Sequence, residues 1–210
     1  KALFIVNSVA ADLALLKTPG EWGAVIAVGD GQSLGIPMSF GGPSVGYMCC
    51  TDKLMRKMPG RIVGKTQDNR GQRVFVLTLQ AREQHIRRQK ATSNICSNES
   101  LMALFVTIYM SVMGREGLKE AAQLSYDAAH YMHDELIATV YFTEKYQQPF
   151  FNEFCLKYSG NVEALQHKFI ANGILGGVKV TDDTLMFAVT EKRTKEEIDK
   201  LVNIVKEEKL

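Results

Sequence analysis

The chain has 210 residues, of which 46% are hydrophobic and 23% charged, and its formal net charge at pH 7 is +2. This is an ordinary globular composition, with room for one large or two small domains. A dedicated nucleic-acid-binding protein normally carries a strong basic excess, so the small net charge argues against that class. Of the four cysteines only Cys49 and Cys50 are close, and adjacent residues lack zinc-site spacing. We therefore expect reduced thiols and no metal.

The start of the chain shows no signal peptide, because Lys1 leads directly into the strand-like run 2–6. The longest apolar stretch, 101–113, is shorter than the roughly 20 residues that span a bilayer. We therefore expect a cytoplasmic protein without a membrane partner. A chain that begins inside a strand also looks truncated.

Continuous apolar runs at 2–6 and 24–28 predict strands that are buried on both faces. Residues 45–50 predict a third strand. A short helix over 13–16 is expected to follow the first strand. A loop rich in glycine and proline, 30–46, separates the second strand from the third.

The middle of the chain predicts a helix, a hairpin and a second helix. Asp52 is expected to cap a short basic helix over 53–58. Strands over 61–66 and 73–79 flank a good turn sequence and predict a hairpin. The charged block 81–90 is predicted to be helical, with Glu83 and Arg87 spaced for an i,i+4 ion pair.

Two long helices follow. Residues 98–113 are apolar on nearly every side, which predicts a helix in the core. The glycines between 114 and 117 predict a break. The second helix has a face of small and apolar residues that favours close packing: Leu118, Ala121, Ala122, Ser125, Ala129, Met132 and Leu136.

The last third predicts a small α/β domain, with strands over 150–158 and 184–189 and a helix over 162–172 between them. Thr194 is expected to cap a final helix, with Glu197 in the capping-box position. The predicted organisation is α/β in three parts. These parts are 1–97 from a large domain, 98–137 as a helical connection, and 138–210 as a small C-terminal domain.

Two segments are candidates for chemistry. The glycine loop 29–43 follows a predicted buried strand, where open α/β sheets bind ligands and bare amides can approach a phosphate. Its spacing fits neither the dinucleotide fingerprint nor the P-loop, so a tight structural loop is the alternative. The block 82–94 brings arginines to a helix entrance, which is typical of anion binding, although a solvated helix face is the alternative.

The four histidines have no metal-ligand spacing, and we expect them to lie on the surface or to serve packing. Only two of them, His130 and His133, are close enough in sequence to share a helix face.

Several of these segments together resemble subunit 1 (alpha) of the two-subunit glycine dehydrogenase (decarboxylating), the P-protein of the glycine cleavage system. The resemblance covers essentially the whole chain and corresponds to about the second half of such a subunit. It rests on sequence motifs at 29–35, 40–43, 58–64, 75–88, 90–95 and 149–154. It implies a pyridoxal-phosphate (PLP) fold type I architecture, with part of a large-domain sheet and a small C-terminal α/β domain.

The resemblance also implies that this subunit has no working cofactor site of its own. In the companion beta subunit, the lysine that holds PLP lies four residues before an Ile-Pro pair. Four residues before Ile36-Pro37 stands Gln32, which cannot hold the cofactor covalently. The acidic partner of the pyridine nitrogen is expected near Val9, which is apolar, and Asp12 is off-register. We therefore expect no catalytic residue here and PLP bound by the beta subunit.

The expected partners are the beta subunit, in an alpha2beta2 assembly, and the lipoylated H-protein. By analogy with fold type I interfaces, Gly41 and Gly42 are candidates to face the partner's cofactor. Candidates for the interface or the substrate entrance are Arg82, Arg87, Thr92, Ser93 and Asn94.

Three functional readings follow. In the first, this chain is part of a glycine decarboxylase that is active only with its partner. In the second, it is a catalytically inert scaffold that stabilises the beta subunit. The third, a self-sufficient PLP enzyme, conflicts with Gln32. Because a truncated sheet exposes an edge, we also expect the chain to self-associate.

Overall fold

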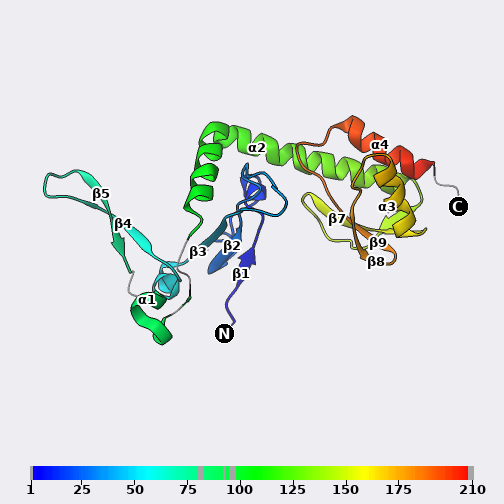
Figure 1. Ribbon diagram of the computed structural model, residues 1–210. Coiled ribbons are helices and arrows are strands. Elements are labelled where there is room, and N and C mark those ends of the chain that lie inside the picture. Colours follow the sequence, from blue (N-terminus) through cyan, green and yellow to red (C-terminus); the bar gives the residue numbers. More distant parts are fainter. Residues whose placement is uncertain (1, 80–82, 92, 95–97, 208–210) are drawn as a thin grey trace. The chain divides into compact units, whose positions relative to one another are not determined.

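The computed structural model describes residues 2–79, 83–91, 93–94 and 98–207 (Figure 1). They belong to two compact units, Lys1–Val112 and Met113–Leu210, and each unit is described by itself. The boundary between the units falls inside the segment that the sequence predicts as a helical connection.

The first unit contains a three-stranded sheet with the strand order β1-β2-β3. The strands are β1 (Ile5–Asn7), β2 (Ile26–Asp30) and β3 (Gly46–Cys50). β1 and β2 are parallel, whereas β3 pairs antiparallel with β2. All three strands were predicted. The expectation that β1 is buried on both faces is wrong for this chain, because β1 is an edge strand and Ile5 is 51% exposed.

The first unit also contains the predicted hairpin, formed by β4 (Ile62–Gln67) and β5 (Arg73–Thr78). Its turn is held by Asp68, whose Oδ1 accepts hydrogen bonds from the amides of Arg70 and Gln72 at 2.8 and 2.9 Å. An Asp side chain that bonds amides two and more residues ahead is a common turn device, which explains why the turn could be predicted.

The short helices of this unit differ in detail from the prediction. They are the 3-10 helices η1 (Ala11–Ala14), η2 (Asp52–Lys57) and η3 (Arg88–Lys90), and the α-helix α1 (Gln84–Arg87). Asp52 lies inside η2 and Thr51 precedes it, so the predicted cap was wrong by one residue. The predicted helix over 81–90 is divided at Arg88, whose φ of 53° is left-handed and ends α1.

Helix α2 (Ser100–Ala138) contains the predicted break at Gly114, where φ is 61° and ψ is −175°. Before the break, the prediction of a core helix is wrong for this chain. Leu101 is 71% exposed, and so in large part are Leu104, Ile108 and Val112, whereas Val106 is buried. One side of the helix contacts the glycine loop. The other side is exposed, and its apolar composition could not predict this exposure.

By length and composition, α2 is one helix of this structure that is long and apolar enough to cross a membrane, with a mean hydropathy of 1.3 in its most apolar window. A helix that packs in a soluble protein passes the same test. In the first unit Tyr109 of α2 packs on Gly35, where an added Cβ would come within 2.3 Å of the tyrosine ring. The apolar side chains of α2 therefore serve packing on at least this side.

The second unit is built on a four-stranded antiparallel sheet with the order β6-β7-β9-β8. Its strands are β6 (Phe142–Glu144), β7 (Glu153–Tyr158), β8 (Val178–Thr181) and β9 (Thr184–Ala188). The helices α3 (Val162–Ala171) and α4 (Lys195–Lys206) pack with it. The short strands β6 and β8 were not predicted.

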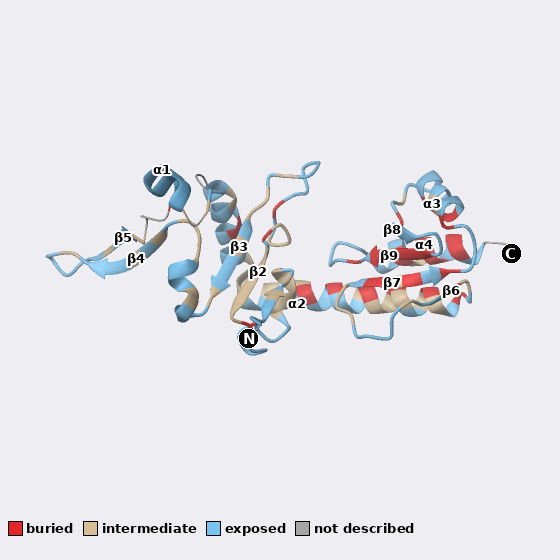
Figure 2. Cartoon of the chain, turned by 90° about the horizontal axis from the view of Figure 1, so that it is seen from below, coloured by how far each residue is buried: buried red, intermediate tan, exposed pale blue. Residues whose placement is uncertain are grey.

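A continuous apolar core holds the second unit together. Figure 2 shows the buried residues in the C-terminal part of α2, in β7 and β9, and in α4. The predicted face of α2 is confirmed, because Ala129 and Leu136 are fully buried. The capping box at α4 is also confirmed. The Thr194 hydroxyl accepts a hydrogen bond from the Glu197 amide, and the Thr194 amide donates to the Glu197 carboxylate.

Candidate functional site

The parallel pairing of β1 and β2 brings two chain segments to one edge of the sheet. Ser8 follows β1, and its amide donates a hydrogen bond of 3.1 Å to the carbonyl of Val28 in β2. The loop that begins at Gly31 follows β2 at the same edge. Ligands of open α/β sheets bind outside the carboxyl ends of the strands, so this edge is the candidate site.

The sheet is packed tightly just below this edge. The Tyr47 hydroxyl of β3 donates a hydrogen bond of 2.8 Å to the Ser8 carbonyl, and the same hydroxyl lies 2.8 Å from the Ser8 Oγ. Gly29 lies between them, and a Cβ at this position would come within 2.2 Å of the Ser8 carbonyl oxygen. Only glycine allows the three strands to approach this closely.

Gln32, at the predicted lysine position, is used by its own loop. Its Nε2 donates a hydrogen bond of 2.7 Å to the carbonyl of Ile36, and the Ile36 amide donates back to the Gln32 carbonyl at 3.1 Å. The side chain therefore closes a turn of five residues. Gln32 is therefore a structural residue of this loop, at the position where the family motif predicts the lysine of a PLP site.

Asp30 fixes the start of the same loop. Its Oδ1 accepts a hydrogen bond of 2.6 Å from the Gln32 amide, and the Ser44 hydroxyl lies 2.6 Å from both carboxylate oxygens. Gly31 bonds the Val45 carbonyl through its amide at 2.7 Å. These contacts tie the beginning of the glycine loop to its end.

The residues at this edge do not fit a covalently held PLP. Position 32 offers an amide in place of an amine, and Val9, which is 42% exposed, offers no carboxylate for a pyridine nitrogen. Ser33, which follows Gln32, accepts a hydrogen bond of 3.3 Å from the Ala11 amide. The described side chains at this edge, Asp30, Gln32 and Ser33, make hydrogen bonds within the protein.

The tip of the glycine loop is open. The amides of Gly41 and Gly42 both donate to the Met38 carbonyl, at 2.8 and 3.1 Å, so they are engaged within the tip. A Cβ at Gly41 would meet no atom within 4 Å, which leaves room for another chain to approach the backbone. Phe40 is fully exposed with a left-handed φ of 59°, and Met38 is 78% exposed. Large apolar side chains thus stand in solvent on a strained tip.

The second candidate segment is organised by Glu83. This glutamate is only 5% exposed and pairs with Arg61, which lies just before β4. Its other oxygen lies 3.1 Å from His85 Nε2. The predicted pair with Arg87 is therefore wrong, because the buried carboxylate turns to Arg61 and His85.

Hydrogen bonding from Arg61 lowers the pKa of the Glu83 carboxyl, and the charges of Arg61 and His85 act in the same direction. Glu83 therefore remains ionised at neutral pH. Sequence reasoning singled out the arginines of this block and missed Glu83 and Arg61 as its anchor. The sequence did contain a signal for this pair. A buried carboxylate needs a cation as its partner, and Arg61 stands at the start of the neighbouring hairpin.

The other predicted residues of the block are placed as follows. Arg87 ends α1 and is exposed, Ser93 is partly buried, and Asn94 is exposed. Arg82 and Thr92 lie outside the described residues. The predicted contact of these residues with a partner chain remains a prediction.

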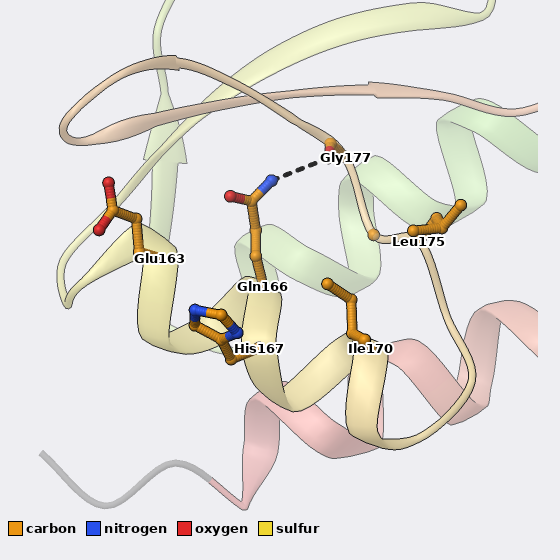
Figure 3. Close-up of a pocket in the computed structure, with 7 residues that line it drawn as sticks. Glu163, Gln166, His167, Ile170, Leu175 and Gly177 are labelled. Atoms are coloured by element: carbon orange, nitrogen blue, oxygen red, sulfur yellow. Dashed lines mark hydrogen bonds between the residues drawn. The ribbon is translucent and has the colours of Figure 1, made fainter.

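The second unit has two hollows of its own. The smaller lies between α3 and the loop before β8, with a volume of about 230 Å³. Figure 3 shows Gln166 donating a hydrogen bond of 3.1 Å to the Gly177 carbonyl across it, beside Glu163 and His167. Its apolar rim residue Leu175 is 93% exposed.

Solved structures with low sequence identity define the fold class. A NifS-like protein from Rickettsia africae matches with a TM-score of 0.63 at 11% identity, over 98% of this chain and 53% of that one. A C-DES mutant with glycine linked to its PLP cofactor matches with a TM-score of 0.62 at 13% identity, over 94% and 49%. The chain has the PLP-dependent fold type I architecture.

Comparison of the sequence with family models identifies the family. Residues 1–205 match the family model of the glycine cleavage system P-protein, and the chain belongs to this family. The crystal structure of an inhibitor-bound glycine decarboxylase (P-protein) of the glycine cleavage system matches with a TM-score of 0.92 at 42% identity. That match covers 98% of this chain and 48% of the other. The family predicted from the motifs is confirmed.

Curated relatives carry the subunit name. The probable glycine dehydrogenase (decarboxylating) subunit 1 of Moorella thermoacetica is 52% identical over 90% of this chain and 44% of its own length. The corresponding protein of Carboxydothermus hydrogenoformans is 49% identical over 98% and 47%. The chain spans about half the length of the curated relatives it matches.

Proposed function

We propose that this chain forms part of the alpha subunit of glycine decarboxylase and acts only with a beta subunit that holds PLP. The relatives named as subunit 1 support the assignment of the subunit. The observation that carries the proposal is the hydrogen bond from Gln32 Nε2 to the Ile36 carbonyl, at 2.7 Å. Gln32, at the predicted lysine position, has no amine that could hold PLP, and its side-chain amide is already bonded within its own loop.

When bound in the partner, PLP supplies an electron sink for decarboxylation of glycine. In the proposed assembly, an alpha2beta2 complex in the cytoplasm, the remaining aminomethyl group passes to the lipoyl arm of the H-protein. The role of this chain is to shape one wall of the partner's site. Gly41 and Gly42 suit close approach, because a Cβ at either would meet no atom nearer than 3.9 Å and their φ angles of 110° and 151° favour glycine.

The first test locates the cofactor. Full-length subunit 1 and its partner are combined with PLP, reduced with borohydride and digested, and the peptides that carry the added mass are identified by mass spectrometry. We expect the label on a lysine of the partner. A label on any lysine of this chain would overturn the proposal.

The second test separates a role in catalysis from a role as a scaffold. Gly41→Ala in the full-length subunit places a side chain at a left-handed position on the open tip. We expect normal assembly with the partner and reduced glycine turnover. Gly20→Ala is the control, because no atom lies within 4 Å of its added Cβ and its φ is not left-handed. Unchanged turnover in Gly41→Ala would favour the scaffold.

A further inference from the structure

The larger hollow of the second unit has a volume of about 540 Å³ and lies between α2, the loop after β6, and strands β7 and β9. This volume is within the range of small-molecule sites in proteins. It belongs to the second unit, which has its own apolar core, whereas the loop around Gln32 belongs to the first.

Aromatic rings form one wall of this cavity. The imidazole of His130 is stacked between Tyr126 and Phe150, with ring centroids 3.9 and 4.2 Å away. Phe150 also contacts Phe154, at 5.1 Å between centroids. Stacked rings of this kind hold one another in place, so the wall is preformed.

The hydrogen bonds of the histidines fix where their protons lie. His130 Nδ1 is 2.9 Å from the Tyr126 carbonyl, and His133 Nδ1 is 3.0 Å from the Asp134 carboxylate. Both oxygens can only accept, so each Nδ1 carries the hydrogen. In the neutral rings Nε2 is therefore an acceptor at the cavity.

Carboxylates complete the lining. Glu144 lies 3.8 Å from His133 Nε2, and the exposed residue Glu153 also lines the cavity. The residues that line the cavity include no lysine and no arginine. The cavity thus combines acceptors and negative charge with apolar surface from Phe150 and Met186.

An ammonium group on an apolar stem matches this lining. It has three N–H donors and no acceptor, which suits the Glu144 carboxylate and the His133 Nε2, 3.8 Å apart. Its methylene stem suits the ring faces, which also attract cations. A metal ion fits less well, because no three His, Cys, Asp or Glu side chains gather in a ligand geometry among the described residues.

We propose that the cavity lined by His130, His133, Glu144, Phe150 and Glu153 binds an alkylammonium group, carried either by a free amine or by a lysine side chain of a polypeptide.

The experiment follows the histidine ring signals of the 210-residue chain by NMR while probes are added. The probes are pentylammonium, which represents a free amine, and Nα-acetyl-lysine N-methylamide, which represents a lysine of a polypeptide. The neutral control is the same lysine derivative with its side-chain amine acetylated. His85 and His167 lie outside the cavity and serve as internal references.

We expect the signals of His130 and His133 to shift saturably with at least one cationic probe, while His85 and His167 stay in place. Saturation with pentylammonium alone would assign a free amine, and saturation with the lysine probe would assign a polypeptide. Glu144→Gln should weaken binding about tenfold, the usual effect of losing a charged hydrogen-bond partner. Glu163→Gln at the smaller hollow should leave it unchanged.

Three results would overturn the proposal. One is the absence of a saturable shift with both cationic probes. Another is equal binding of the acetylated control, which would make the cavity indifferent to charge. The third is full affinity in Glu144→Gln, because position 144 is exposed and folding is not at risk there.

Discussion

The side-chain nitrogen of Gln32 donates a hydrogen bond of 2.7 Å to the carbonyl of Ile36, and this bond closes the turn that follows β2. A lysine cannot make the same bond without drawing its charged amine back into its own loop. Gln32 therefore has a structural role in its own loop.

Gln32→Ala should therefore loosen the loop. A hydrogen bond of this type contributes about 1 kcal/mol, so amide exchange at Ile36 should accelerate about fivefold. Hydrogen-exchange mass spectrometry of the 210-residue chain measures it. Gln72→Ala is the matched control, because this side chain makes no hydrogen bond with a described residue. Equal exchange in the two variants would contradict the structural role of Gln32.

Gly29→Ala should destabilise the first unit. The new Cβ would come within 2.2 Å of the Ser8 carbonyl, and overpacking of this kind typically costs about 1–3 kcal/mol. Trp22 is the sole tryptophan and lies in this unit, so its fluorescence during urea unfolding reports on the change. In the control Gly46→Ala on β3, the nearest atom is 3.8 Å away, and the midpoint should move little.

These positions show what the sequence could predict and what it could not. The hairpin turn at Asp68 and the cap at Thr194 were predicted because their hydrogen bonds join residues within four positions. The partner of Glu83 was mispredicted because Arg61 is 22 residues away.

At the candidate site, the sequence identified Gln32 as a non-lysine through the family motif. It gave no indication that the amide turns to Ile36. Nor did it reveal the exposed face of α2, since apolar composition alone does not say which surfaces find a partner. The cavity beside His130 joins a helix, a loop and two strands, and such a combination exists only once the chain is folded.

Phe169→Ala should destabilise the second unit strongly. This ring is fully buried in the core, and truncating a buried phenylalanine typically costs about 3–5 kcal/mol. Thermal unfolding followed by far-UV circular dichroism measures the loss. Leu175→Ala, at a side chain 93% exposed in the same unit, is the control and should unfold like the parent chain.

The second unit should lose stability in acid. The side chains of Lys195 and Tyr131 donate hydrogen bonds of 2.7 and 2.5 Å to the Asp199 carboxylate. These hydrogen bonds lower the pKa of Asp199. A carboxyl with a lowered pKa stabilises the fold above its unfolded value of about 4, and this stability is lost as the pH falls through the folded value. The melting temperature should therefore fall between pH 5 and pH 2.

Asp199→Asn tests the source of this effect. The variant lacks the titrating group, so its melting temperature should depend less on pH across the same interval than that of the parent chain. Parallel curves for the two proteins would show that Asp199 contributes nothing to the acid transition.

Arg61→Ala should release the segment around α1. Among the described residues, the Glu83 carboxylate would keep His85 as its one cationic partner, and a buried carboxylate without its main cation is destabilising. Limited trypsin digestion should then cut after Arg87 or Arg88 faster than in the parent chain. Arg73→Ala is the control, because Arg73 lies over the Phe75 ring on the hairpin and does not touch Glu83. Unchanged cleavage in Arg61→Ala would show that Arg61 does not hold this segment in place.

The full exposure of Phe40 has a practical consequence for variant screening. A side chain this exposed can be exchanged with little loss of contacts to the residues that the structure describes. A mutational scan scored by expression, solubility or melting temperature would then record position 40 as tolerant. Only a scan scored by the proposed activity, with the full-length subunit and its proposed partner, would reveal whether selection acts on that ring.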